Sequence, residues 1–254
     1  MQLWSEDKLF QRTALMLGEK KMQALAQKKG IIFGIGGVGS WCAESLIRSG
    51  IRKLCLVDFD VVCESNVNRQ AHASVNSLNQ TKVIAMKNRL LEINPLAEIQ
   101  TMHEVFSEQT KEKFQLNTYD FIVDAIDSIE SKLLLIRMAT ETEALFVSSM
   151  GAALKMDPTR IKVTEFWKVH GCRLAYILRK RIRKGQLPAK PFWCVYSDEL
   201  IPNEGDTSNK ETDAAATHGI KKAVINGTVA HITAIFGFTL AGLIIQSFYQ
   251  DYSE

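Results

Sequence analysis

The sequence predicts an α/β protein in which a mainly parallel sheet carries helices on both faces. Short apolar stretches alternate along the chain with longer stretches in which apolar residues recur three and four positions apart, as in alternating strands and helices. Polar residues do not interrupt the apolar stretches at every second position, which is typical of strands buried on both faces. Together these patterns favour a Rossmann-like sheet, extended by further strands and helices toward the C-terminus.

The first unit of this fold begins at Gly30. The apolar strand GIIF leads into the turn GIGGVG, a helix in SWCAESLIRSG and a second strand, KLCLVDFD. A helix follows over residues 82–93 and stops before Asn94-Pro95, because the residue before a proline disfavours helical backbone. The remaining elements up to Met150 are strands in EIQTMH, YDFIVDAI and ALFVSSM and a helix in KLLLIRMATETE.

Beyond Met150 the pattern changes. We expect a strand in IKVTEF, a basic helix in LAYILRKRIRKG, a polar, acidic connector over residues 198–217 and an apolar helix within residues 223–245. The chain is interpreted as a single domain over residues 1–254, in which residues 1–150 form the nucleotide-binding half and residues 151–254 complete the sheet and build the substrate and dimer side.

The apolar stretch 223–245 is about as long as a membrane span, which requires roughly 20 residues. Polar side chains inside it would each need a partner in lipid; these are Asn226, Thr228, His231 and Thr233. We therefore expect a helix buried in the core or in a subunit interface, with membrane association as the alternative. A histidine in the core is a poor acid–base candidate, and neither His231 nor His218 in the connector is expected to act as one.

Composition limits the classes of function. The chain has 31 Lys and Arg against 28 Asp and Glu, and this net charge of +3 excludes a protein that coats nucleic acid with its whole surface. Its five cysteines are odd in number, and no two of them form a Cys-x-x-Cys pair. This usage favours reduced thiols in the cytoplasm and gives no support for a cysteine-bound zinc site.

The glycine turn predicts a nucleotide site. Gly34, Gly36 and Gly39 form G-x-G-x-x-G between a predicted strand and a predicted helix, where backbone amides can hold phosphate. Asp58 follows the next strand, at a position from which a carboxylate can accept both hydroxyls of a ribose. NAD and ATP fit these features equally.

Charged residues after the second strand favour ATP. A triphosphate that loses pyrophosphate needs cations and a metal at the reacting phosphate, and Arg69 and Lys82 can supply the cations. Asn66 is an uncharged donor to phosphate oxygens, and Asp124 and Asp127 carry oxygen ligands suited to Mg²⁺. The alternative is that the cations are solvated surface charges and that Asp127 caps a helix.

The run GIGGVG, DFD, SNVNRQ, Lys82 and DAIDS resembles the adenylating domain shared by ubiquitin-activating enzymes and the bacterial enzymes that activate sulfur-carrier proteins. The resemblance implies that ATP and Mg²⁺ activate a carboxylate as an acyl-adenylate. It assigns ribose binding to Asp58, phosphate contacts to Asn66, Arg69 and Lys82, and the metal to Asp127. It also implies a homodimer in which Arg12 reaches the partner's ATP site. The other ATP-binding positions are Gly34, Gly36, Gly37, Gly39 and Asp60.

Two departures indicate a particular branch of this family. Zinc-binding Cys-x-x-Cys pairs are missing, and Cys172 and Cys194 are more typical of small buried residues than of acyl carriers. The opening FQRTALMLGEKK, the run from Cys194 to Ser197 and the closing HITAIFGFTLAGLII resemble the branch that dehydrates threonylcarbamoyladenosine in tRNA. This resemblance implies ATP-driven cyclisation of that nucleoside to an oxazolone, with a sulfur-transfer (cysteine desulfurase) system as a further partner.

The positive charge is concentrated in residues 168–197, which hold eight Lys or Arg and no Asp or Glu. Such a segment attracts the phosphate backbone of tRNA without reading its sequence. The candidate contacts are Arg179, Lys180, Arg181, Arg183 and Lys184. Four aromatic residues flank the segment and could stack on an unpaired base: Phe166, Trp167, Phe192 and Trp193. The alternative is a solvated helix face with core aromatics.

Three other functions compete with tRNA dehydration. Adenylation of the C-terminal glycine of a ubiquitin-like sulfur carrier uses the same ATP site, although the zinc pairs are missing. An NAD-dependent oxidoreductase is favoured by the glycine turn and Asp58 alone. A nucleotide-gated scaffold that passes sulfur or RNA between partners would use the same pocket without catalysis.

Overall fold

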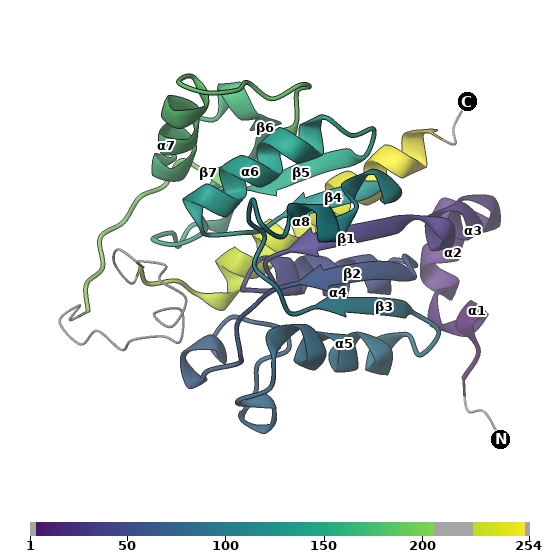
Figure 1. Ribbon diagram of the computed structural model, residues 1–254. Coiled ribbons are helices and arrows are strands. Elements are labelled where there is room, and N and C mark those ends of the chain that lie inside the picture. The colour runs from purple at the N-terminus through teal and green to yellow at the C-terminus, as the bar shows by residue number, and fades with distance from the viewer. Residues whose placement is uncertain (1–3, 206–225, 252–254) are drawn as a thin grey trace.

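The computed structural model describes residues 4–205 and 226–251. Within them, one seven-stranded sheet has the order β3-β2-β1-β4-β5-β7-β6 (Figure 1). All neighbouring strands pair in parallel except β6, which runs antiparallel to β7 at one edge. The strands are β1 (Lys29–Phe33), β2 (Lys53–Val57), β3 (Glu98–Met102), β4 (Phe121–Asp124), β5 (Leu145–Ser149), β6 (Ile161–Glu165) and β7 (Trp193–Ser197). The predicted α/β fold class is confirmed.

The helices cover both faces of this sheet (Figure 1). They are α1 (Glu6–Leu9), α2 (Gln11–Leu17), α3 (Glu19–Gln27), α4 (Gly39–Arg48), α5 (Lys82–Ile93), α6 (Ile129–Thr140), α7 (Arg173–Ile182) and α8 (Ala230–Asp251). Strand β7 was not predicted from the sequence, because its five residues follow Pro191 in a segment dominated by basic residues. Since β7 pairs with β5, the second half of the chain extends the sheet of the first.

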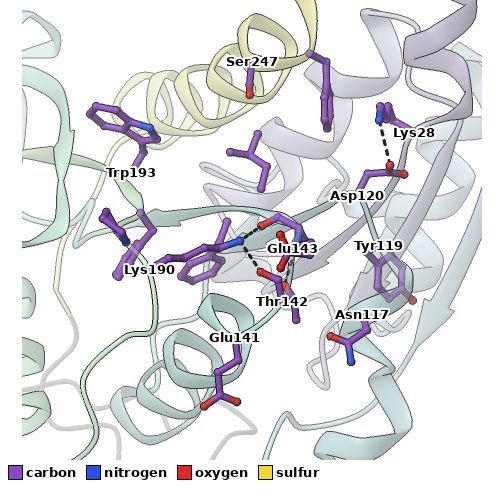
Figure 2. Close-up of a pocket in the computed structure, with 16 residues that line it drawn as sticks. Lys28, Asn117, Tyr119, Asp120, Glu141, Thr142, Glu143, Lys190, Trp193 and Ser247 are labelled. Atoms are coloured by element: carbon purple, nitrogen blue, oxygen red, sulfur yellow. Dashed lines mark hydrogen bonds and ion pairs between the residues drawn. The ribbon is translucent and has the colours of Figure 1, made fainter. Parts of the chain in front are cut away.

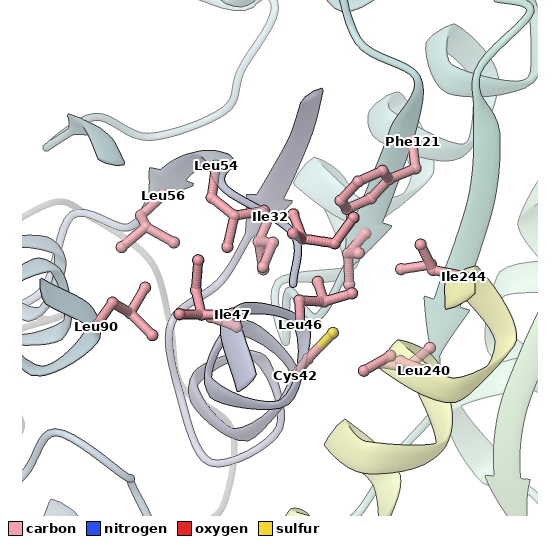
Figure 3. Packing of buried hydrophobic residues seen from close by; sticks show 14 of the residues in the cluster. Ile32, Cys42, Leu46, Ile47, Leu54, Leu56, Leu90, Phe121, Leu240 and Ile244 are labelled. Carbon is pink, nitrogen blue, oxygen red and sulfur yellow. The ribbon is translucent and has the colours of Figure 1, made fainter. Parts of the chain in front are cut away.

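The two faces of the sheet carry separate hydrophobic clusters. On β1, Ile32 packs into the cluster formed with α4, α5 and α8, whereas Ile31 and Phe33 belong to the cluster formed with α6 and α7. Figure 3 shows the first cluster, in which Ile32 lies close to Leu46 of α4. Successive residues of one strand are therefore all buried, which explains the continuous apolar pattern in the sequence.

Helix α8 is a core helix of this fold. Residues Ala230–Gln250 have a mean hydropathy of 1.7 and make up one helix, among the described residues, long and apolar enough to cross a membrane. Its side chains Phe236, Leu240 and Ile244 are nevertheless fully buried against α4 and the sheet. A transmembrane position would remove these side chains from the core, so the expected buried helix is the arrangement that the structure shows.

Candidate active site

The glycine turn after β1 is shaped by two close backbone approaches. Gly34 has φ = +87°, and a Cβ on it would lie 2.6 Å from the carbonyl oxygen of Ala125. A Cβ on Gly39 would lie 1.9 Å from the carbonyl oxygen of Gly34. Both positions therefore require glycine for the turn itself. Gly36 has open space where its Cβ would be, which leaves room beside its backbone for a phosphate group.

Helix α4 begins at the end of this turn. Within the described residues no side chain caps its first turn, which leaves backbone N–H groups at a positive helix terminus. The fourth predicted glycine, Gly37, lies against α8, since its Cβ would be 3.1 Å from Thr233. The turn is thus held between β1, α4 and α8 and has the local structure of an anion site.

Asp58 joins the ends of β1 and β2. Its Oδ2 accepts a hydrogen bond from the backbone N–H of Ile35 at 2.7 Å, and its Oδ1 accepts one from the backbone N–H of Asp60 at 2.9 Å. Burial raises the pKa of Asp58, and the positive charge of Lys82 partly opposes this rise. The carboxylate is therefore fixed beside the glycine turn, where the sequence predicts a ribose ligand.

Lys82 is the buried cation of the site. Its Nζ lies 2.7 Å from Oδ2 of Asp60, and the side chain is almost completely removed from solvent. Burial opposes its charge, but the carboxylates of Asp58, Asp60 and Asp127 together raise the pKa of Lys82. The structure therefore brings the three acids predicted for the site close enough to one lysine to keep it protonated.

Asn66 and Arg69 lie on the neighbouring loop. The Oδ1 of Asn66 accepts a hydrogen bond from the N–H of Cys63 at 3.1 Å, and the guanidinium of Arg69 donates to the carbonyl of Ser65 at 2.6 Å. The indole of Trp41 on α4 donates to the carbonyl of Arg69 at 2.9 Å. The loop is thus fastened to the helix that starts at the glycine turn.

The two aspartates that follow β4 have different environments. Asp124 is fully buried, with Lys132 at 2.9 Å, the hydroxyl of Ser148 at 2.7 Å and the N–H of Ile126 at 3.2 Å. Its carboxylate is fully buried and engaged by these three partners, which favours a structural role for Asp124 over the Mg²⁺ binding suggested by the sequence. Asp127 is exposed at the end of the same loop and fits a Mg²⁺ ion that takes most of its ligands from phosphate and water.

Lys132 was not predicted as part of the site. It lies inside the apolar run of α6, is fully buried, and donates to the carbonyl of Ile126 at 3.0 Å besides pairing with Asp124. The loop between Asp124 and Asp127 is therefore clamped at Ile126 through both its N–H and its carbonyl. A lysine within an apolar helical stretch was the signal that could have indicated this buried ion pair.

His72 was not predicted either. Within the described residues neither ring nitrogen has a hydrogen-bond partner, although both are buried. Burial, assisted by the charge of Lys82, lowers the pKa of His72 to about 3, so the ring is neutral at physiological pH. The histidines considered from the sequence are elsewhere: His218 lies outside the described residues, and His231 is exposed at the start of α8, where it contacts the carbonyl of Met156 rather than the core.

The remaining predicted residues are spread over the surface and the core. Arg12 is exposed on α2, at the edge of the sheet where β1 begins and so far from its own glycine turn (Figure 1). Cys172 and Cys194 are buried in the cluster under α7, and burial raises the pKa of Cys194 further above its usual value. Neither thiol is accessible for acyl transfer. Among the described residues no group of three or more His, Cys, Asp or Glu side chains is arranged to hold a metal ion by itself. Much of the acidic connector, residues 206–217, lies outside the described residues.

Some basic side chains of α7 and the turn after it are bonded to neighbouring elements, and others are exposed. Arg179 donates to the carbonyls of Phe166 and Val169, and Arg181 pairs with Glu130 at the start of α6. These two arginines hold α7 in place. Lys180 and Lys184 are exposed, and the guanidinium carbon of Arg183 lies 5.6 Å from the centroid of the Trp167 ring.

A cavity of about 690 Å³ opens at the opposite edge of the sheet, where the parallel strands begin. Figure 2 shows Lys28 paired with Asp120 there, and Lys190 bonded to backbone oxygens of residues 142 and 144. Trp193 lines this cavity and Ser247 of α8 closes one side. None of the residues predicted for the nucleotide site lines it, so the cavity and the glycine turn are separate.

Comparison with known proteins agrees with this site. The tRNA threonylcarbamoyladenosine dehydratase of Bacillus subtilis is 33% identical over 245 residues, which is 95% of each chain. The Escherichia coli protein of the same name is 33% identical over 90% of this chain and 89% of its own. The structure of that Escherichia coli enzyme in complex with ATP matches with a TM-score of 0.84 and 29% identity over 98% of each chain.

The molybdopterin-synthase adenylyltransferase of Haemophilus influenzae is more distant, with 31% identity over 55% of each chain. The profile of the ThiF family matches residues 10–253. This match includes the glycine turn, the carboxylates around Lys82 and the core helix α8. The chain therefore belongs to the ThiF family.

Proposed function

We propose that this protein uses ATP to activate the carboxylate of threonylcarbamoyladenosine in tRNA and to close it into a cyclic oxazolone, with net loss of one water. The relatives that carry this activity in their names align with almost the whole chain. The Escherichia coli enzyme has been crystallised with ATP and with AMP, which supports ATP rather than NAD as the nucleotide.

The observation that carries the proposal is the buried Lys82 surrounded by Asp58, Asp60 and Asp127 beside the glycine turn. A triphosphate bound along the turn places its reacting phosphate next to a cation that is protonated at all physiological pH values. We assign the ribose hydroxyls to Asp58 and the phosphates to Arg69 and Asn66. Asp127 would hold Mg²⁺, which would offset the charge of the leaving pyrophosphate.

The reaction has two displacements. A carboxylate oxygen of the substrate bonds to the α-phosphorus and pyrophosphate leaves, with Lys82, Arg69 and the amides of α4 stabilising the negative charge. The carbamoyl oxygen of the same substrate group then bonds to the activated acyl carbon, AMP leaves, and the carbamoyl group releases one N–H proton to solvent. Because this second step is intramolecular, positioning of the substrate replaces a covalent enzyme intermediate. The burial of Cys172 and Cys194 agrees with this route.

The same proposal includes three partners of this protein: the tRNA, a second copy of the chain and a sulfur-transfer system. The tRNA backbone lies along α7 and the turn after it, where the exposed Lys180, Arg183 and Lys184 would contact phosphates and Arg179 and Arg181 fix the helix. The protein acts as a homodimer in which Arg12 of each subunit reaches the ATP site of the other, a proposal that the exposed position of Arg12 away from its own glycine turn supports. A sulfur-transfer system is a further partner, and we place the protein in the cytoplasm, where its five free cysteines stay reduced.

The test is to incubate the purified protein with ATP, Mg²⁺ and tRNA that carries threonylcarbamoyladenosine, and to weigh the nucleosides released under mild conditions. ATP-dependent loss of one water from that nucleoside is the expected result. An unchanged nucleoside with protein that binds ATP would refute the proposal. Pyrophosphate exchange that appears only with a small carrier protein ending in two glycines would instead support the sulfur-carrier alternative.

A further inference from the structure

We propose that Trp167 and Tyr176 form a stacking surface for unpaired bases of the tRNA on either side of the modified adenosine. This inference rests on the proposed function and names the part of the protein that holds the RNA loop. The two side chains are 38% and 62% exposed, respectively, although both belong to well-packed elements. Large exposed aromatic side chains beside basic residues are typical of surfaces that bind single-stranded nucleic acid.

Trp167 is held rigidly although its ring is exposed. It lies in a 3₁₀ helix (Phe166–Lys168), and its backbone N–H donates to Oε2 of Glu165 at 2.9 Å. Arg179 of α7 bonds the carbonyls on both sides of this helix. Below it, Phe166 is fully buried and stacked on Phe192, with ring centroids 4.8 Å apart. The indole is thus a fixed platform, and little conformational entropy is lost when a base stacks on it.

The same contacts correct part of the prediction made from the sequence. Of the four aromatics suggested for stacking, Phe166 and Phe192 are buried in the core. Trp193 is 50% exposed but lines the cavity beside α8, on the face of the sheet away from α7 (Figure 2). Only Trp167 of these four combines exposure with proximity to α7, and the structure adds Tyr176, which was not predicted from the sequence.

Helix α7 presents a basic stripe around Tyr176. Arg173, Tyr176 and Lys180 are all exposed and recur three or four positions apart, so they follow one side of the helix, and the exposed Lys184 lies just beyond the end of α7. Arg183 lies two turns after Tyr176, about 10 Å along the axis, and its guanidinium is over the Trp167 ring. The two aromatic rings therefore lie along one strip of positive charge.

This strip is fastened next to the catalytic edge of the sheet. Arg181 pairs with Glu130 in the first turn of α6, and Glu130 follows Asp127 by three residues. The end of α7 is thus beside the loop that carries the proposed metal ligand.

The chemistry of the substrate explains why stacking is needed. The reacting carboxylate is attached to an adenine, and that base must leave its stack for the carboxylate to reach the phosphate of ATP. The neighbouring bases then lose a stacking partner. Aromatic side chains restore this contact for any base, whereas lysines alone attract only the backbone.

The experiment measures the affinity of the full-length protein for tRNA carrying threonylcarbamoyladenosine at two salt concentrations. We expect Trp167→Ala and Tyr176→Ala each to weaken binding by about 5-fold to 150-fold without changing the salt dependence. Lys180→Ala should instead reduce the salt slope by about one. The matched control is Trp193→Ala, an exposed tryptophan on the α8 face of the sheet, which should bind as the parent does.

Two further measurements separate stacking from folding and from charge. Trp167→Phe keeps an aromatic face and should recover most of the affinity. Binding of a blunt RNA duplex without unpaired bases should be the same for Trp167→Ala and the parent. Unchanged tRNA affinity in Trp167→Ala and Tyr176→Ala, or an equal loss for the duplex, would overturn the proposal. Failure of the parent protein to dehydrate the nucleoside would count against the proposed function alone, because the binding measurements do not depend on turnover.

Discussion

The buried pair of Lys132 and Asp124 makes a quantitative prediction about stability. Both side chains are fully buried, with 2.9 Å between Nζ and Oδ2. In Lys132→Met the volume is nearly kept, but the carboxylate loses its counter-charge and retains only Ser148 and the N–H of Ile126 as partners. Breaking a buried ion pair on one side costs about 3–5 kcal/mol. For a domain of this size this loss lowers Tm by about 6–20 °C.

A double variant tests whether the uncompensated charge of Asp124 causes this loss of stability. In Lys132→Met/Asp124→Asn the uncompensated charge is absent, and an amide can still accept from Ile126 and bond Ser148. The remaining cost is the hydrogen bond from Lys132 to the carbonyl of Ile126, about 1 kcal/mol. The double variant should therefore be more stable than Lys132→Met by about 2–4 kcal/mol, a coupling that a mere packing defect would not produce.

The assay is urea denaturation followed by far-UV circular dichroism, with Tm as a second measure. The exposed Lys20 provides the control, since Lys20→Met should change stability by no more than about 0.5 kcal/mol. A loss below about 1 kcal/mol in Lys132→Met, or no recovery in the double variant, would refute the reasoning. Because Lys132 clamps the loop before Asp127, the single variant should also lose dehydratase turnover below its melting temperature.

Three other changes have defined outcomes. Asp127→Ala should lose at least about 100-fold in turnover, because an exposed metal ligand is removed, with its urea midpoint unchanged; activity near the parent level would exclude the metal role. The folded-state pKa of about 3 for His72 lies below the unfolded value of about 6.5, so the unfolded state binds the extra proton first and stability falls as pH drops through this window. At pH 5 this loss is about 2 kcal/mol relative to pH 7, and His72→Gln should abolish it whereas His103→Gln, at an exposed position, should not. Gly39→Ala should destabilise the fold by more than about 3 kcal/mol because its Cβ meets a backbone oxygen at 1.9 Å, whereas Gly36→Ala should fold normally and weaken ATP binding; equal stabilities would contradict the roles assigned to these two glycines.

Local patterns in the sequence determined the fold class and much of the nucleotide site. Continuous apolar strands, amphipathic helices and the glycine turn each depend on residues close together in the sequence, so the α/β class and the nucleotide edge could be predicted without a structure. The carboxylates around Lys82 could also be predicted from the sequence, because each follows a strand and the ends of parallel strands meet at one edge of the sheet. The family resemblance added the roles of individual residues, which patterns of spacing do not define.

Tertiary structure decided which of these side chains are free to act. Asp124 and Asp127 are equivalent carboxylates in the sequence, but burial against Lys132 makes the first structural and leaves the second exposed. Trp167 and Trp193 are likewise equivalent aromatics beside basic residues, yet Trp167 lies under Arg183 at the end of α7, whereas Trp193 lines the cavity beside α8 on the other face of the sheet. The physical reason is that burial and ion pairing depend on contacts between segments far apart in the chain, and these contacts exist only once the sheet has formed.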